Sequence, residues 1–169
     1  ILDSSIIKRT MEINFLGQVY FTEYLLPIMK SQRSGILVAT STLPDHRGLA
    51  GWGAYGASKA ALSWFMESLR GEAKQRYNIK IITVNPGAVE TPMIKGYHRP
   101  GAISAAKAAE YVIKGIKKGK KVIQFTLKEV LVVRATDLFT ASLHDIIPLE
   151  KQKMDGYPVV EEKINIKNK

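Results

Sequence analysis

The amino-acid sequence predicts an α/β fold built around a parallel β-sheet. Three short runs rich in apolar or β-branched residues, 36–41, 79–85 and 122–126, have the length and composition of strands. Longer segments with helical spacing of apolar residues separate these runs, and such alternation is typical of parallel sheets. The first run is almost continuously apolar (Ile36-Leu37-Val38-Ala39), which favours a strand covered on both faces.

Two long helices are expected, one before and one after the first strand in the sequence. Residues 3–31 carry apolar side chains about one helical turn apart, with Asp3 or Ser4 as the N-cap. Pro27 is expected to disturb the last turn or two, because proline lacks the amide proton that a helix uses. Residues 54–76 form the second helix, whose apolar face contains Ala60, Ala61, Leu62, Phe65, Met66 and Leu69.

Two further helices are expected in the C-terminal half. Ser104 has the position of an N-cap for residues 105–118, and Gly119 has the position of a stop signal. Residues 128–143 form the fourth predicted helix. Residues 146–169 contain proline, glycine and a terminal Lys/Asn cluster, and we expect an extended or partly disordered tail there.

Length and composition are those of one soluble domain. The chain has 169 residues, 46% hydrophobic and 24% charged, so it can bury a core, and residues 1–145 are assigned to a single domain. No apolar stretch reaches the roughly 18 residues of a membrane span, so we expect a cytoplasmic protein without a transmembrane segment. Cysteine is absent, and His46, His98 and His144 lack the spacing of metal ligands, so no metal site is expected.

The formal net charge of +10 has an uneven distribution. A charged helix face is usually solvated, and the basic stretch has neither a nucleic-acid-binding motif nor interleaved aromatic residues. We therefore expect a solvated face and no nucleic-acid partner; the alternatives are a nucleic acid or an anionic membrane surface. The lysines in question lie on the third helix and at its end: Lys107, Lys114, Lys117, Lys118, Lys120 and Lys121.

Tyr55 and Lys59 form the most informative pair in the sequence. They are four residues apart in Tyr55-Gly56-Ala57-Ser58-Lys59, so both side chains lie on one face of the second helix. An ammonium one turn away stabilises the charged form of a phenol, and such a phenol can pass a proton to or from a carbonyl or alcohol oxygen. Taken alone, the pair also fits a helical tyrosine beside a solvated lysine.

Two strand ends favour the catalytic interpretation of Tyr55 and Lys59. Thr42 lies thirteen residues before Tyr55, at the end of the first predicted strand, and a loop rich in glycine and proline joins the two. Asn85-Pro86-Gly87 breaks the second strand, and the glycine allows close approach of a ligand to the backbone. Ligands of open α/β sheets bind outside the carboxyl ends of the strands, so these segments are expected to share one crevice.

In their order and spacing, these segments resemble the short-chain dehydrogenase/reductase superfamily over residues 1 to about 125. The resemblance implies a Rossmann-like doubly wound parallel sheet and an NAD(P)-dependent oxidoreductase that moves hydride between nicotinamide and a carbonyl or secondary alcohol carbon. It rests on Asn14-Phe15-Leu16-Gly17, Gly35 with the strand after it, Ser41-Thr42, Arg47-Gly48-Leu49, Tyr55-Gly56-Ala57-Ser58-Lys59-Ala60-Ala61-Leu62 and Asn85-Pro86-Gly87-Ala88-Val89-Glu90-Thr91-Pro92-Met93.

The resemblance implies a role for each catalytic candidate. Tyr55 would be the acid/base, and Lys59 would stabilise its phenolate and bind the nicotinamide ribose. Thr42 falls where the family usually has a serine that holds the substrate oxygen; we prefer it to the adjacent Ser41, which remains the alternative. Asn14 would hold a water molecule that extends the proton relay to the lysine.

The resemblance also implies cofactor and assembly contacts. Pro86, Gly87, Val89 and Thr91 would line the nicotinamide, together with Tyr55 and Lys59. The cofactor is NADP or NAD, and the positive charge of the chain favours the phosphorylated dinucleotide. In the family the two long helices pack against their copies, so a homodimer or homotetramer is expected.

The substrate region is expected to accept an apolar carbonyl or alcohol. Trp52, Met93, Ile94 and Tyr97 would line it together with Thr42, and the loop after Thr91 would fold over the substrate as a lid. The alternative is that these apolar side chains pack against the sheet or a neighbouring subunit.

One feature of the family is missing from this sequence. No glycine-rich loop joins a strand to a helix, although such a loop normally binds the pyrophosphate. We therefore expect the chain to be the C-terminal portion of a longer protein, with N-terminal strands missing from the sheet. The strand at 36–41 would then be an unpaired apolar edge that an oligomer or further sequence covers. The alternative function is a non-catalytic remnant or assembly module of the same fold.

Overall fold

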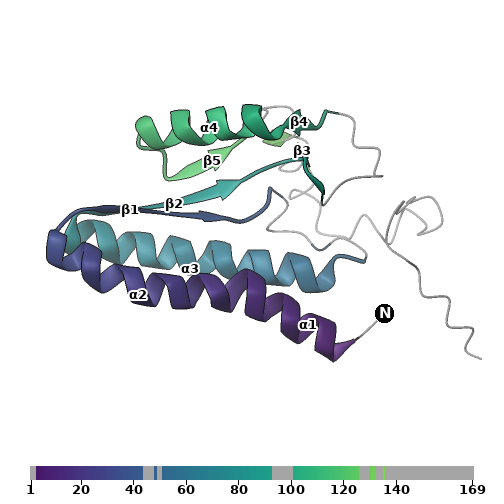
Figure 1. Cartoon of the computed structure of the whole chain (residues 1–169), viewed down its shortest axis with the longest axis horizontal. Helices are drawn as coiled ribbons and strands as arrows, with labels where there is room; N and C mark the ends of the chain where they lie inside the picture. The colour runs from purple at the N-terminus through teal and green to yellow at the C-terminus, as the bar shows by residue number, and fades with distance from the viewer. Residues whose placement is uncertain are drawn as a thin grey trace, which may run out of the picture.

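The structure is a computed structural model that describes residues 3–43, 48, 51–92, 101–125, 130, 131 and 135. Three parallel strands form its main sheet in the order β1-β2-β5. Helices cover both faces of this sheet (Figure 1). The α/β class and the parallel sheet predicted from the sequence are therefore confirmed. The strands are β1 (Gly35–Thr40), β2 (Ile79–Asn85) and β5 (Val122–Gln124).

The helices divide unequally between the two faces. One face is covered by a long helical run and by α3 (Gly53–Tyr77), and the other by α4 (Ala105–Lys117) (Figure 1). The long run consists of α1 (Ser4–Met11), the π-helical turn η1 (Glu12–Leu16) and α2 (Gly17–Gln32).

The long helical run begins as expected but is irregular at an unexpected point. Asp3 is its N-cap and accepts hydrogen bonds from the backbone N–H of Ser5 (2.9 Å) and Ile6 (3.4 Å). In η1 the backbone N–H of Gly17 donates to the carbonyl of Glu12, five residues back, which widens the helix locally. Pro27, in contrast, lies inside α2, which continues to Gln32.

The ends of α3 and α4 follow the residue types that the sequence supplies. Asn78 follows α3 in the left-handed conformation (φ 57°), which asparagine tolerates better than most residues. The Ser104 hydroxyl accepts a hydrogen bond from the backbone N–H of Lys107 at 3.2 Å and so caps α4. Gly119 has φ 66° just beyond α4, where a side chain would be strained. The predicted cap and stop of this helix are confirmed.

The strand register fixes which residues share a face. Gly35 of β1 is paired with Ile79 of β2, and Thr83 of β2 is paired with Val122 of β5. A second, two-stranded sheet was not predicted. Its strands, β3 (Val89–Glu90) and β4 (Ile103–Ser104), have only two residues each, too few for an alternating pattern.

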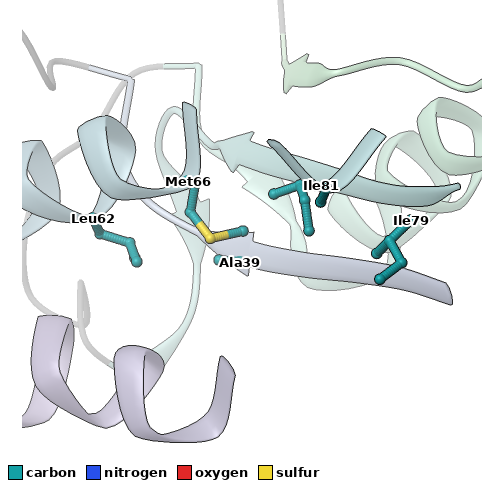
Figure 2. Packing of buried hydrophobic residues seen from close by; sticks show 6 residues of the cluster. Ala39, Leu62, Met66, Ile79 and Ile81 are labelled. Atoms are coloured by element: carbon teal, nitrogen blue, oxygen red, sulfur yellow. The ribbon is translucent and has the colours of Figure 1, made fainter. Parts of the chain in front are cut away.

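The core lies on both faces of β2. Ile79 and Ile81 contact the α3 side, where they pack with Leu62, Met66 and Ala39 (Figure 2). On the α4 side a second cluster forms, consisting of Ile82, Val84, Ala108, Ile123 and Phe125. Alternate side chains of a strand point to opposite faces, so the odd and even positions of β2 bury two separate layers.

Strand β1 is less covered than its apolar sequence predicts. Leu37 and Ala39 pack on the α3 side, whereas Ile36 and Val38 remain 46% and 36% exposed. The expectation of burial on both faces is therefore wrong for the described part of the chain. Within that part β1 pairs with β2 alone, so its other edge is open, as the sequence predicts.

Several predictions lie outside the described residues. They concern almost all of the helix at 128–143, the tail at 146–169, and the substrate residues Met93 and Tyr97. Among the helices that the structure does describe, none has the length and apolarity required to cross a membrane.

Candidate active site

The carboxyl ends of β1 and β2 are joined beyond the strands themselves. The backbone N–H of Ser41 donates to the carbonyl of Val84 at 2.8 Å, and that of Leu43 donates to the carbonyl of Pro86 at 3.0 Å. Because Thr42 lies between these two donors, the pairing holds it beside the loop that follows β2. The structure thus brings two of the predicted site segments together.

The hydroxyls of Ser41 and Thr42 differ in their partners. Ser41 Oγ donates to the carbonyl of Lys59 at 2.9 Å and accepts from Ser63 Oγ at 2.8 Å, so it ties the end of β1 to α3. Thr42 is also buried, with 8% exposure, but its hydroxyl forms no hydrogen bond with the described residues. Of the two, Thr42 therefore has the hydroxyl that a ligand oxygen can use.

Lys59 is held against the end of the sheet. Its ammonium Nζ donates to the carbonyl of Thr40 at 2.8 Å and lies 5.9 Å from the centroid of the Tyr55 ring. Burial lowers the pKa of Lys59 below the ordinary lysine value of 10.5. An ammonium has three protons, so Thr40 leaves two of them for other acceptors.

Trp52 stands next to Tyr55 at the start of α3. The two rings meet edge to face, with centroids 5.4 Å apart and planes at 77°. The carbonyl of Trp52 accepts the first backbone hydrogen bond of the helix, from Gly56 at 2.7 Å. Such edge-to-face contacts restrict both rings, so Trp52 forms an apolar wall beside the phenol.

Asn14 connects to Tyr55 through a residue that was not predicted. Its side-chain amide donates to Ser58 Oγ at 3.1 Å, and Ser58 Oγ donates to the carbonyl of Tyr55 at 2.7 Å. Ser58 is a residue of α3 and is completely buried, and its partner Asn14 belongs to the π-helical turn. These two hydrogen bonds, from Asn14 to Ser58 and from Ser58 to the Tyr55 carbonyl, therefore fix the backbone of Tyr55 rather than its hydroxyl.

The loop after β2 continues into the small second sheet. The backbone N–H of Ile103 donates to the carbonyl of Ala88 at 3.1 Å, and Val89 packs against the α4-side core. Gly87 is half-buried and Thr91 is exposed, just before the undescribed residues 93–100. The structure thus brings Pro86 and Gly87 to the strand ends, whereas Val89 points partly into the core.

Sequence reasoning missed three groups at this site: the carbonyl of Thr40, and the hydroxyls of Ser58 and Ser63. Only one of them leaves a local signal. Ser58 is three residues after Tyr55, a spacing at which a serine hydroxyl can bond back to a helix carbonyl. The contacts with β1 and with Asn14 join distant segments, and nothing in the sequence marks them.

Comparison with known proteins shows that the chain is similar to one protein family over more than half of its length. A family profile described as short chain dehydrogenase matches residues 1–100. An uncharacterized oxidoreductase of Myxococcus xanthus is 30% identical over 141 residues, which cover 82% of this chain and 55% of that protein. A 3-dehydrosphinganine reductase of Danio rerio is 30% identical over 132 residues, which cover 78% of this chain and 39% of that protein. The chain thus spans about half the length, or less, of these curated relatives.

A solved structure supports the fold independently. It is a short chain dehydrogenase from Burkholderia cenocepacia in complex with NADP, with a TM-score of 0.75 and 21% sequence identity. The match covers 86% of this chain and 62% of that one. At this level of identity the likeness supports the fold alone.

Proposed function

The chain belongs to the short-chain dehydrogenase family, and on that premise we propose that it carries the acid/base machinery of an NAD(P)-dependent oxidoreductase. The reaction would interconvert a carbonyl and a secondary alcohol. The observation that carries the proposal is the position of Lys59, a half-buried ammonium anchored on the Thr40 carbonyl beside the Tyr55 ring.

Tyr55 would deliver the proton. In reduction its hydroxyl donates to the substrate oxygen as that oxygen gains negative charge, and in oxidation the phenolate takes the proton back. The Lys59 ammonium adds positive charge beside the Tyr55 ring, in a partly buried site where charges are less screened than in water. The Thr42 hydroxyl, which has no partner among the described residues, would hold the same substrate oxygen, and Asn14 would support the relay.

The residues at the strand ends suit a nicotinamide cofactor. The two remaining protons of the Lys59 ammonium can bind ribose hydroxyls, and the loop at Pro86 and Gly87 offers backbone groups to a carboxamide. Val89 and Thr91 would complete this contact. A bound nicotinamide would supply or accept the hydride. NADP is preferred to NAD, with support from the net charge of +10 and from the NADP complex of the Burkholderia cenocepacia protein.

The substrate would be an apolar ketone or its alcohol. Trp52 provides an aromatic wall next to Tyr55, which favours an apolar group on one side of the reacting carbon. The name of the Danio rerio relative, 3-dehydrosphinganine reductase, supports a long-chain ketone as the first compound to assay.

The direct test is Tyr55→Phe in the intact natural protein. The variant keeps the ring and its contact with Trp52 but loses the transferable proton, so turnover of a long-chain 3-ketone with NADPH should fall by about 10²- to 10⁴-fold. Thermal unfolding should stay unchanged within about 0.5 kcal/mol, as for a substitution that creates no cavity. Normal turnover of the Phe variant would defeat the assignment.

Titration with NADPH separates this function from a non-catalytic module of the same fold. Enhancement of NADPH fluorescence on binding supports a working cofactor site. Lys59→Met should weaken that binding by removing the ribose donors, whereas Lys74→Met, at an exposed position of the same helix, should not. A flat titration with the intact protein would favour the non-catalytic module.

We also propose that the long helices pair with a second copy of the chain. Aromatic side chains on α2 and α3 are strongly exposed: Phe21 by 67%, Tyr24 by 73% and Trp64 by 73%. Exposed apolar patches of this kind mark interaction surfaces more often than ordinary protein surface.

A further inference from the structure

The C-terminal end of α4 carries an unusual concentration of positive charge. Five lysines fall within eight residues, and all five side chains are exposed. None of them forms an ion pair or side-chain hydrogen bond with a residue that the structure describes. We call this group the lysine cluster: Lys114, Lys117, Lys118, Lys120 and Lys121.

The first turns of α4 differ from this end. Lys107 is paired with Glu110 at 2.7 Å, so the positive charge there is neutralised. Between Glu110, one turn before Lys114, and Glu129 the sequence has no aspartate or glutamate, so no acidic residue lies within the cluster. The positive field is thus confined to the last turns of α4 and the connection to β5.

One exposed aliphatic side chain lies among these lysines. Ala108 and Gly115 are buried against the sheet, so the opposite face of α4 points outward. Ile113 is on that outward face, one turn before Lys117, and is 53% exposed. Val122 directly follows Lys121 and is 40% exposed, but it is paired with Thr83 and so points to the α3 face of the sheet. The surface of α4 is therefore cationic with one apolar side chain among the charges.

Helix stability accounts for only part of this arrangement. Lysines in the last turn interact favourably with the helix dipole, which explains Lys114 and Lys117. Lys120 and Lys121 lie beyond Gly119, where the helix has ended. The exposure of Ile113 has no stabilising effect on the helix either.

We propose that the lysine cluster docks on an anionic lipid membrane surface. Lysine ammonium groups act as point charges and are attracted to acidic headgroups without a required geometry. The cluster lacks arginine, whose planar fork is the usual reader of individual phosphates in nucleic acids. Ile113 can enter the headgroup region, where an aliphatic side chain gains free energy that a nucleic acid would not supply.

The location leaves the candidate active site accessible. The cluster precedes β5 and so lies at the amino end of that strand, whereas Thr42 and Pro86 follow the carboxyl ends of β1 and β2 (Figure 1). In a parallel sheet the amino ends and the carboxyl ends of the strands lie at opposite ends of the sheet. Membrane docking and substrate binding would therefore use different surfaces of the chain.

Vesicle sedimentation with the full chain tests the proposal. The chain should bind phosphatidylcholine vesicles that contain phosphatidylserine, and binding should weaken as salt is raised, since exposed charges are screened. Binding to pure phosphatidylcholine should be much weaker. Absence of salt-sensitive binding to the phosphatidylserine vesicles would overturn the proposal.

Two triple variants with equal charge change locate the binding surface. Lys117→Gln/Lys118→Gln/Lys121→Gln should weaken vesicle binding by about a hundred-fold, because the variant loses the attraction of three lysines to the anionic membrane surface. The control Lys8→Gln/Arg9→Gln/Lys74→Gln changes three exposed positions elsewhere and should cost about three-fold or less. Equal losses in the two triples would mean that net charge alone acts, which contradicts a specific surface.

The aliphatic side chain distinguishes a membrane from a nucleic acid. Ile113→Ser should weaken vesicle binding by about three-fold while retention on a short DNA duplex stays unchanged. Ile113 is exposed, so circular dichroism should show unchanged folding. Unchanged vesicle binding, combined with equally tight DNA binding, would identify a general polyanion site and overturn the membrane assignment.

Discussion

The side-chain amide of Asn14 donates a hydrogen bond to Ser58 Oγ at 3.1 Å, across 44 residues of sequence. This bond joins the π-helical turn to the helix that carries Tyr55. Ser58 Oγ in turn donates a hydrogen bond to the Tyr55 carbonyl at 2.7 Å. Since Ser58 is completely buried, its hydroxyl cannot exchange this bond for one with water without a local opening. The position of the phenol thus depends on a contact between the two long helices.

A double-mutant cycle on this pair should show strong coupling. Ser58→Ala removes a buried acceptor and leaves the Asn14 amide without its partner, which costs about 1–3 kcal/mol of unfolding free energy. Asn14→Ala in the Ser58→Ala background should cost much less than in the wild type, with a coupling of about 0.5–1.5 kcal/mol. Urea unfolding of the wild type, the two single variants and the double variant measures this coupling. Effects of the two substitutions that add within about 0.3 kcal/mol would contradict the contact.

Substitutions of Ser41 and Thr42 should have different effects, one on stability and the other on activity. Ser41→Ala breaks the bonds to the Lys59 carbonyl and to Ser63, so unfolding free energy should fall by about 1–2 kcal/mol. Thr42→Val removes a hydroxyl without a partner among the described residues, so stability should change little. Turnover of the intact protein should fall sharply in Thr42→Val and recover in Thr42→Ser. The reverse pattern would assign the substrate hydroxyl to Ser41.

Burial of Lys59 should make stability rise with pH in the alkaline range. The pKa of Lys59 is lowered in the folded state, so between that pKa and 10.5 the unfolded chain binds more protons. Unfolding free energy from urea titrations should therefore increase with pH through this window. Lys59→Met should reduce the slope, whereas Lys74→Met should retain it. An identical slope in Lys59→Met and the wild type would rule out the lowered pKa.

Two glycines in helices should respond oppositely to alanine. A Cβ on Gly115 would lie 2.6 Å from Ile123 Cγ1 and Cδ1, so Gly115→Ala should overpack the contact of α4 with β5. Gly71 has open space, and Gly71→Ala should stabilise the chain by about 0.5–1 kcal/mol. Helix propensity contributes equally to both, so their difference, about 1–3 kcal/mol by thermal unfolding, isolates the packing cost. Equal effects would mean that Ile123 moves aside freely.

The exposed aromatic surface of α2 should mediate self-association. Phe21→Glu places a charge in an apolar contact, which opposes burial of that surface in a dimer. Light scattering should give a lower mass for this variant than for the wild type. Gln75→Glu adds the same charge at an exposed position of α3 and should leave the mass unchanged. A wild-type mass of a single chain at all concentrations would refute the association.

Short-range patterns predicted much of this fold. The three strands, the cap at Asp3, the cap at Ser104 and the stop at Gly119 depend on neighbouring residues, so they could be recognised within a few positions of sequence. The four-residue spacing of Tyr55 and Lys59 belongs to the same class, because one helical turn sets it. The irregularity at residues 12–16 was missed, since no proline or glycine pair marks a π-helical turn.

Tertiary structure decided the features that join distant segments. Which of the Ser41 and Thr42 hydroxyls has a partner among the described residues depended on the position of Lys59 in α3, and the role of Ser58 depended on Asn14 in another helix. The sequence likewise showed the lysines of α4, but only the packing of Gly115 against Ile123 determined that Ile113 faces outward with them. Sequence by itself determined local periodicity and caps because backbone hydrogen bonds act over a few residues. The site and the cationic surface required the fold because their contacts cross tens of residues.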